Sequence, residues 1–340
     1  MRVSRFDFQE IKDLSFPDLE SFVEEEYLHD TRIEDILWFW QAIREAPKLT
    51  RVSSWSVNRM LPYSQLTWLE LRYVDEDDLR LLFEVLPSCT RLQSLELWIF
   101  RLNGGAEPIS LETVEISSLR ELAVRELNGY DILHDDPILV ALFTSLAMPS
   151  LASFTLSCCG WPESLSTLAK RSPLLRRVQL NNPDVDDVDI SSTIDSLNSF
   201  LYSLPYLMQL ELHMATLTTW KTSSCVLSDG LLSTLLSGLR LFPNRPSHLP
   251  KLDTIRLRLP DVTLDTKVVE EVLEVVKHRH SESSPMKQIS VYRHGEKVLL
   301  QPATVGRIRE VELACDAKIV IKEWTEGEGL WISDSTPDST

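Results

Sequence analysis

The chain has 340 residues, of which 43% are hydrophobic and 25% are charged, and its formal net charge is −17 at pH 7. This composition can bury a substantial apolar core and is not that of a disordered chain. The negative charge disfavours nucleic acid and anionic membrane surfaces as partners, because both require a broad excess of Lys and Arg.

The cysteines and the N-terminal segment bear on the cellular compartment. There are five cysteines, an odd number, and none has the C-x-x-C spacing. The first residues, MRVSRFDFQEIKD, are charged and lack the apolar core of a secretory signal. Because thiols stay reduced in the cytosol and nucleus, we expect a cytoplasmic or nuclear protein.

The N-terminal part of the chain contains two weak copies of the motif L-x-x-L-x-L. The first has Leu19 and Phe22, and the second has Leu49 and Val52. Between them, residues 33–45 have the pattern of a helix that ends before a proline. This segment therefore predicts the order strand, helix, strand.

The clearest copy of the motif is LTWLEL (66–71), whose last two leucines alternate as on one face of a β-strand. The segment 78–86 then places apolar residues at i, i+3, i+4 and i+7, which is one stripe of a helix. LQSLEL restores the motif 26 residues after Leu66. Further copies begin at Leu119, Leu151, Leu175, Leu207, Leu252 and Met286.

One uncharged stretch, 137–162, has the length of a membrane span. It contains Pro149 and six Ser or Thr residues, and the repeat register divides it into a helix (138–147) and a strand (151–156). We therefore expect no membrane segment there.

Neither a single strand nor a single helix of such a unit can bury its apolar side alone, so the units must stack. The sequence predicts an α/β fold: a right-handed solenoid of irregular leucine-rich repeats over 1–302, with parallel strands on the concave face and helices on the convex face. Residues 303–332 are expected to form a C-terminal αβ capping unit with a helix at 304–314 and a strand at 318–321. Residues 333–340 are expected to be a disordered tail.

Four features carry a resemblance to a known family: PKLTRV, HLPKLDTIRL, the degenerate L-x-x-L-x-L strands separated by long helices, and RIREVELACDAKIVIKEW near the end. On these features the chain resembles the leucine-rich-repeat region of large fungal (basidiomycete-type) F-box proteins, over roughly residues 15 to 325. The resemblance implies the substrate-receptor repeats of a ubiquitin-ligase subunit. No F-box pattern is recognisable, so a Skp-type adaptor is implied only if an F-box exists outside this chain.

The clusters of reactive side chains have structural interpretations. His278 and His280 lie near the end of an expected helix and lack further ligands at metal-binding spacing. Cys158 and Cys159 follow a strand, where packing in the core is favoured over redox chemistry. The acidic runs (24–26, 75–78, 135–136 and 184–189) follow strands and precede helices, which N-capping and the helix dipole explain. We expect no metal, no cofactor and no catalytic residue.

The strand residues between the leucines define the candidate binding surface, because they line the concave sheet of a stacked solenoid. They combine tryptophan and arginine, the residue types that dominate binding hot spots, with acidic residues. The candidate partner-binding residues are Trp55, Trp68, Glu70, Arg72, Glu96, Trp98, Arg125, Arg177, Arg256 and Arg258. The alternative for the tryptophans is that they cover the sheet against neighbouring loops.

These patterns favour a non-enzymatic module that binds a protein or peptide. The first alternative is a stand-alone leucine-rich-repeat scaffold without a role in ubiquitination. The second is an enzyme whose site no motif reveals.

Overall fold

The computed structural model describes residues 2–3, 15–24, 33–100, 108–126, 136–158, 161–182, 190–214, 236, 239, 249–259, 266–282, 284–294 and 300–324. The chain divides into two compact units, Met1–Leu207 (unit 1) and Met208–Thr340 (unit 2). In each unit helices stand between several of the successive strands, and the described strand pairs are parallel. The predicted α/β class with a parallel sheet is confirmed.

The sheet of unit 1 has its strands in the order β1-β2-β3-β4-β5-β7-β9-β10. Their bounds are β1 Arg2–Val3, β2 Ser21–Glu24, β3 Arg51–Ser54, β4 Trp68–Val74, β5 Ser94–Ile99, β7 Glu121–Glu126, β9 Ser153–Ser157 and β10 Arg177–Asn182. Two further short strands, β6 (Val114–Glu115) and β8 (Leu146–Ala147), pair with each other in a separate ladder that the sequence did not predict. In the main sheet, therefore, strands adjacent in space follow one another along the chain.

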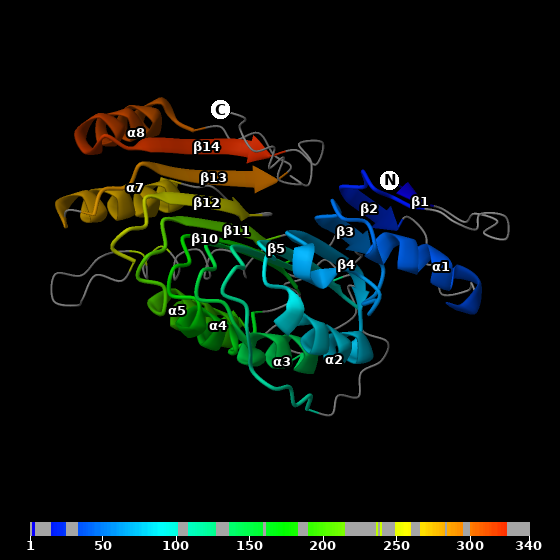
Figure 1. The fold of residues 1–340 in the computed structure, drawn as a ribbon. Helices are drawn as coiled ribbons and strands as arrows, with labels where there is room; N and C mark the ends of the chain where they lie inside the picture. Colours follow the sequence, from blue (N-terminus) through cyan, green and yellow to red (C-terminus); the bar gives the residue numbers. More distant parts are fainter. Residues whose placement is uncertain are drawn as a thin grey trace, which may run out of the picture. The chain divides into compact units, whose positions relative to one another are not determined.

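The helices of unit 1 are α1 Ile33–Arg44, α2 Glu76–Val85, α3 Pro137–Ser145, α4 Leu165–Arg171 and α5 Ile190–Tyr202. In Figure 1, α2, α3, α4 and α5 lie on one side of the strands of this unit. Asp75 and Asp136 begin α2 and α3, and their carboxylates accept backbone N–H groups of the first turn at 2.9 Å and 2.7 Å. The N-cap interpretation of these two acidic positions is confirmed.

The leucines of the repeated motif form rows through the sheet, because the strand register aligns them. Leu69 pairs with Leu95, Leu95 with Leu122, and Leu122 with Phe154. Each is at most 2% exposed. A second row runs through Leu71, Leu97, Val124, Leu156 and Leu180. The interior of unit 1 is built from these rows and the apolar faces of the helices.

A second repeated feature joins the starts of successive strands. The carbonyl of Thr67 accepts the N–H groups of Gln93 and Ser94 at 2.9 and 3.1 Å, and the carbonyl of Gln93 accepts those of Arg120 and Glu121 at 2.8 and 2.9 Å. The same arrangement recurs at Glu20, Thr50, Arg120 and Ala152 in unit 1 and at Met208 and Asp253 in unit 2. The same backbone hydrogen bonds therefore connect one strand start to the next, whatever the side chains there.

Unit 2 has its strands in the order β11-β12-β13-β14. The strands are β11 Gln209–Met214, β12 Thr254–Leu259, β13 Gln288–His294 and β14 Lys318–Trp324, and the helices are α7 Thr266–Ser281 and α8 Pro302–Cys315. Helix α8 and strand β14 confirm the elements predicted at 304–314 and 318–321, and β14 pairs in register with β13. The role of this pair as a cap stays a prediction.

Helix α7 has the basic cluster 278–280 in its last turn, which confirms that the cluster ends this helix. Arg279 within that turn is fully buried. The guanidinium of Arg279 donates to the carbonyls of Leu249 and Leu252 at 2.9 and 2.8 Å. Burial lowers the pKa of this guanidinium to about 10. The residue therefore fixes the chain segment that leads into β12, a contact that the sequence did not predict.

Several predictions lie outside the described residues. These are Cys159, the acidic run 184–189 and the tail 333–340. The predicted boundary of a repeat domain at residue 302 stays a prediction beside the division after Leu207.

The buried rows predict the effect of removing one leucine. Leu95→Ala is expected to lower the free energy of unfolding by about 2–5 kcal/mol, because Leu95 is fully buried and its loss leaves a cavity. Chemical denaturation followed by circular dichroism measures this change. The matched control is Ser94→Ala on the partly exposed side of the same strand, where a change within about 0.5 kcal/mol is expected. Equal losses in the two variants would contradict the buried row.

Candidate binding surface

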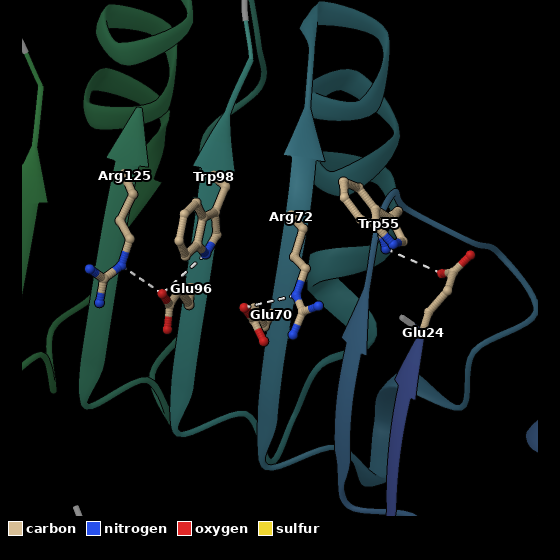
Figure 2. A network of polar contacts seen from close by, with 7 residues as sticks. All are labelled: Glu24, Trp55, Glu70, Arg72, Glu96, Trp98 and Arg125. Carbon is tan, nitrogen blue, oxygen red and sulfur yellow. Dashed lines mark hydrogen bonds and ion pairs between the residues drawn. The ribbon is translucent and has the colours of Figure 1, made fainter. Parts of the chain in front are cut away.

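The strand positions that alternate with the buried rows form one partly exposed face in each unit, which we call the open face. In unit 1 it includes Trp68, Glu70, Arg72, Glu96, Trp98, Arg125 and Arg177. Figure 2 shows side chains of this set projecting from neighbouring strands on the same face. The structure thus places these predicted candidate residues together.

The best-ordered group on this face is centred on the carboxylate of Glu96. One of its oxygens accepts hydrogen bonds from Arg125 Nε at 2.7 Å and from Trp98 Nε1 at 3.1 Å (Figure 2). The guanidinium of Arg125 also lies over the Trp98 ring, 5.4 Å from its centroid. The side chains of Arg125 and Glu96 are only 23% and 21% exposed, so solvent screens this ion pair incompletely.

The neighbouring strand repeats part of this arrangement. Glu70 lies beside Glu96 in the strand register, and its carboxylate accepts from Arg72 Nε at 3.2 Å. Two carboxylates in adjacent register repel each other, and one arginine beside each offsets that repulsion. In the next row Arg51 lies over the ring of Trp68 at 5.3 Å. The half-buried tryptophans Trp68 and Trp98 are therefore each covered on one face by a guanidinium and are not core residues.

Glu24 corrects one interpretation of the acidic runs. It ends β2, is 4% exposed, and accepts from Ser54 Oγ at 2.6 Å and from the backbone N–H of Trp55 at 3.2 Å. It therefore connects the end of β2 to the end of β3. The sequence pattern could have indicated this burial, because Glu24 and Ser54 occupy the third apolar position of their motif copies, after Phe22 and Val52. Trp55 is placed by this contact and is half-buried.

Toward β10, the last strand of unit 1, the ion pair on the open face is longer and more exposed than that of Glu96 and Arg125. Arg177 lies 3.8 Å from Glu121, and both side chains are about half exposed, so this pair adds little stability. Farther along the same strand, Asn181 donates to Ser157 Oγ at 2.8 Å, a cross-strand contact that sequence reasoning missed. Around Asn181 and Ser157 the face is polar and uncharged.

In unit 2 the predicted residues Arg256 and Arg258 lie around one carboxylate. Each approaches Glu211 at 3.6 Å, and Arg258 is also 3.1 Å from His213 Nε2. The guanidinium of Arg258 lies 5.8 Å from the centroid of the Tyr292 ring. Burial, and secondarily the charge of Arg258, lowers the pKa of His213 to about 4. His213 is therefore neutral at physiological pH and can accept from the arginine.

The described residues show little that suggests a reactive centre. They contain no group of three or more His, Cys, Asp or Glu side chains placed to hold a metal ion. Cys89, Cys158 and Cys315 are buried, and burial raises the pKa of Cys89 to about 12. None of the helices within these ranges combines the length and apolar composition needed to cross a bilayer.

No protein-family model matches the chain, and no curated protein matches it at a significant level.

The depressed pKa of His213 predicts a pH-dependent contribution to stability. Because its pKa is about 4 in the folded state and 6.5 ordinarily, the unfolded chain binds a proton first as the pH falls. The contribution is present above pH 6.5 and is lost progressively toward pH 4. Thermal unfolding between pH 7 and pH 4.5 should show a steeper loss for the wild type than for His213→Asn. Parallel curves would contradict this prediction.

Proposed function

We propose that the chain is an irregular leucine-rich-repeat solenoid whose open face is the concave surface of a non-enzymatic protein-recognition module. The repeated order of strand and helix and the register of the leucine rows support the repeat type. The observation that carries the proposed recognition role is the cluster in which Glu96 holds both Trp98 and Arg125.

This cluster has the properties of a pre-formed binding surface. Its aromatic ring and guanidinium are half-buried on rigid strands, and the shared carboxylate fixes their orientation. A ligand that contacts them loses little additional side-chain entropy on binding. Partly exposed tryptophan and arginine are also the residue types that contribute most to protein–protein affinity. A polypeptide ligand fits a surface that offers both hydrogen-bond donors and an aromatic ring.

The family resemblance extends this proposal to a biological role. It suggests a substrate receptor similar to the repeats of an F-box ubiquitin-ligase subunit, with the target held on the open face. The second candidate is a scaffold that binds the same kind of ligand without any link to ubiquitination. The sequence motifs PKLTRV and HLPKLDTIRL favour the receptor.

Trp98→Ala is expected to weaken ligand binding by about 2 kcal/mol or more, roughly 30-fold, because it removes the aromatic contact at the centre of the cluster. The wild type and the variant, immobilised at equal density, would capture ligands by affinity for mass spectrometry. The affinity of each ligand that the wild type captures and the variant does not would then be measured with purified components.

The matched control is Arg80→Ala on the exposed side of α2, where only a helix-surface ion pair with Glu76 is lost. It should keep the wild-type set of ligands. Circular dichroism must show that Trp98→Ala remains folded. If ligands are retained by the folded Trp98→Ala variant, the open face of unit 1 is not the recognition surface.

A second readout separates the receptor from the scaffold. Recovery of a Skp-type adaptor and a cullin with the wild-type chain, together with polyubiquitination of a captured ligand, would support the ligase role. Capture of open-face ligands with neither component would favour the scaffold.

A further inference from the structure

The open face of unit 2 differs in charge from that of unit 1. Three rows of side chains cross its strands in register; they begin at Gln209, Glu211 and His213 on β11 and reach Lys318, Val320 and Lys322 on β14. Among the described side chains in these rows, the cations are Arg256, Arg258, Lys318 and Lys322, and the one carboxylate is Glu211. The corresponding rows of unit 1 contain Arg51, Arg72, Arg125 and Arg177 against Glu70, Glu96 and Glu121. Among the described residues, the excess of cations is therefore larger on the open face of unit 2 than on that of unit 1.

The two units also differ in net charge. Unit 1 contains 18 Lys and Arg against 33 Asp and Glu, a net charge of −15, whereas unit 2 contains 16 against 18, a net charge of −2. An excess of cations on one face of a nearly neutral unit is a local arrangement and does not follow from its composition. Such a face attracts anionic ligands.

The two arginines of this face lie near the same carboxylate. Glu211 is 3.6 Å from both Arg256 and Arg258, beyond the usual 2.7–2.9 Å of a charge-assisted hydrogen bond. In unit 1 the distance between Arg125 and Glu96 is 2.7 Å, whereas that between Arg177 and Glu121 is 3.8 Å.

The same arginines are nevertheless positioned in advance. Arg258 is 14% exposed, and its guanidinium is placed between the neutral ring of His213 and the aromatic ring of Tyr292. Arg256 is 49% exposed and stands beside it on the same strand. A half-buried guanidinium with fixed orientation binds an incoming carboxylate more strongly than a fully solvated one.

The spacing of the cations specifies the ligand further. Arg258, Tyr292 and Lys322 are register partners on three successive strands. With strands about 4.8 Å apart, Arg258 and Lys322 are separated by about 10 Å at their Cα atoms. A single carboxylate or phosphate cannot contact both side chains along this row. Two anionic side chains three residues apart on a peptide in the polyproline II conformation, which has three residues per turn and rises about 3.1 Å per residue, point to the same side and match the separation.

We propose that the open face of unit 2 binds an acidic, extended segment of a partner polypeptide. Carboxylates about three residues apart contact the pair Arg256 and Arg258 at one end and Lys322 at the other, with Tyr292 between them. This inference rests on the proposed recognition function and names the chemistry of its ligand.

The test uses the full chain and a fluorescein-labelled, end-capped twelve-residue peptide with glutamate at every third position and glycine or serine elsewhere. Fluorescence anisotropy at 50 mM salt should show saturable binding. Arg256→Glu and Lys322→Glu should each weaken it at least tenfold, because each reverses the charge of an exposed contact residue. Neither change touches the half-buried Arg258, so both variants should fold, and their thermal unfolding midpoints check this.

The matched control is Arg309→Glu, which makes the same charge change at an exposed position of α8 in the same unit. Its affinity should remain within twofold of the wild type. Equal weakening by Arg309→Glu would show non-specific charge attraction and overturn the proposal. Equal affinity for a peptide with a single glutamate, or displacement by millimolar inorganic phosphate alone, would also overturn it.

The outcome is separable from that of the recognition function. If Trp98→Ala abolishes capture of ligands while the glutamate peptide fails to bind, the proposed function stands and the acidic-ligand inference fails. If the glutamate peptide binds as expected while the Trp98→Ala variant retains all ligands, unit 2 carries recognition and the role proposed for unit 1 is wrong.

Discussion

The in-register packing of apolar side chains from successive strands is the constraint on which the rest of the structure depends. Leu69, Leu95 and Leu122 occupy equivalent positions on neighbouring parallel strands and are nearly fully buried. A shift of one residue in any strand would place its leucines on the open face and its charged side chains among the helices. The burial of these rows therefore fixes which side chains are presented on the opposite face, and in what order.

The repeated connection between strand starts is a backbone hydrogen bond and not a row of one side-chain type. The carbonyl that precedes a strand, such as that of Thr67 or Gln93, accepts two N–H groups at the start of the next strand. Because this bond does not depend on side-chain identity, the motif positions beside it can vary. This explains how spacings from 24 to 45 residues between motif copies are compatible with regular strand pairing within each unit.

The sequence predicted the strands and helices well where periodicity was strong, as in the segment 66–97, and it placed the open-face residues on the correct side. It failed where a polar residue occupied an apolar position. Glu24 was interpreted as a helix-start acid, although its place in the motif was that of a buried leucine. The buried contacts of Arg279 were not predicted, because the carbonyls that it binds come from a segment about thirty residues earlier. The pairing of Glu96 with Arg125 was likewise not predictable, since it depends on the register between strands 29 residues apart.

The two open faces differ in charge because the strand register places a different number of acidic residues on each. Both units place an arginine guanidinium over an aromatic ring, Arg125 at 5.4 Å from the centroid of Trp98 and Arg258 at 5.8 Å from that of Tyr292. In unit 1 a carboxylate occupies the register position next to another carboxylate, so the arginines are needed to offset repulsion within the face. In unit 2 the register partners of Glu211 are Arg256 and then Ser290, so no second acid competes for the guanidiniums. Among the described residues each face carries four cations, so the difference between a nearly balanced face and a cationic one arises from the acids, of which unit 1 has three and unit 2 has one.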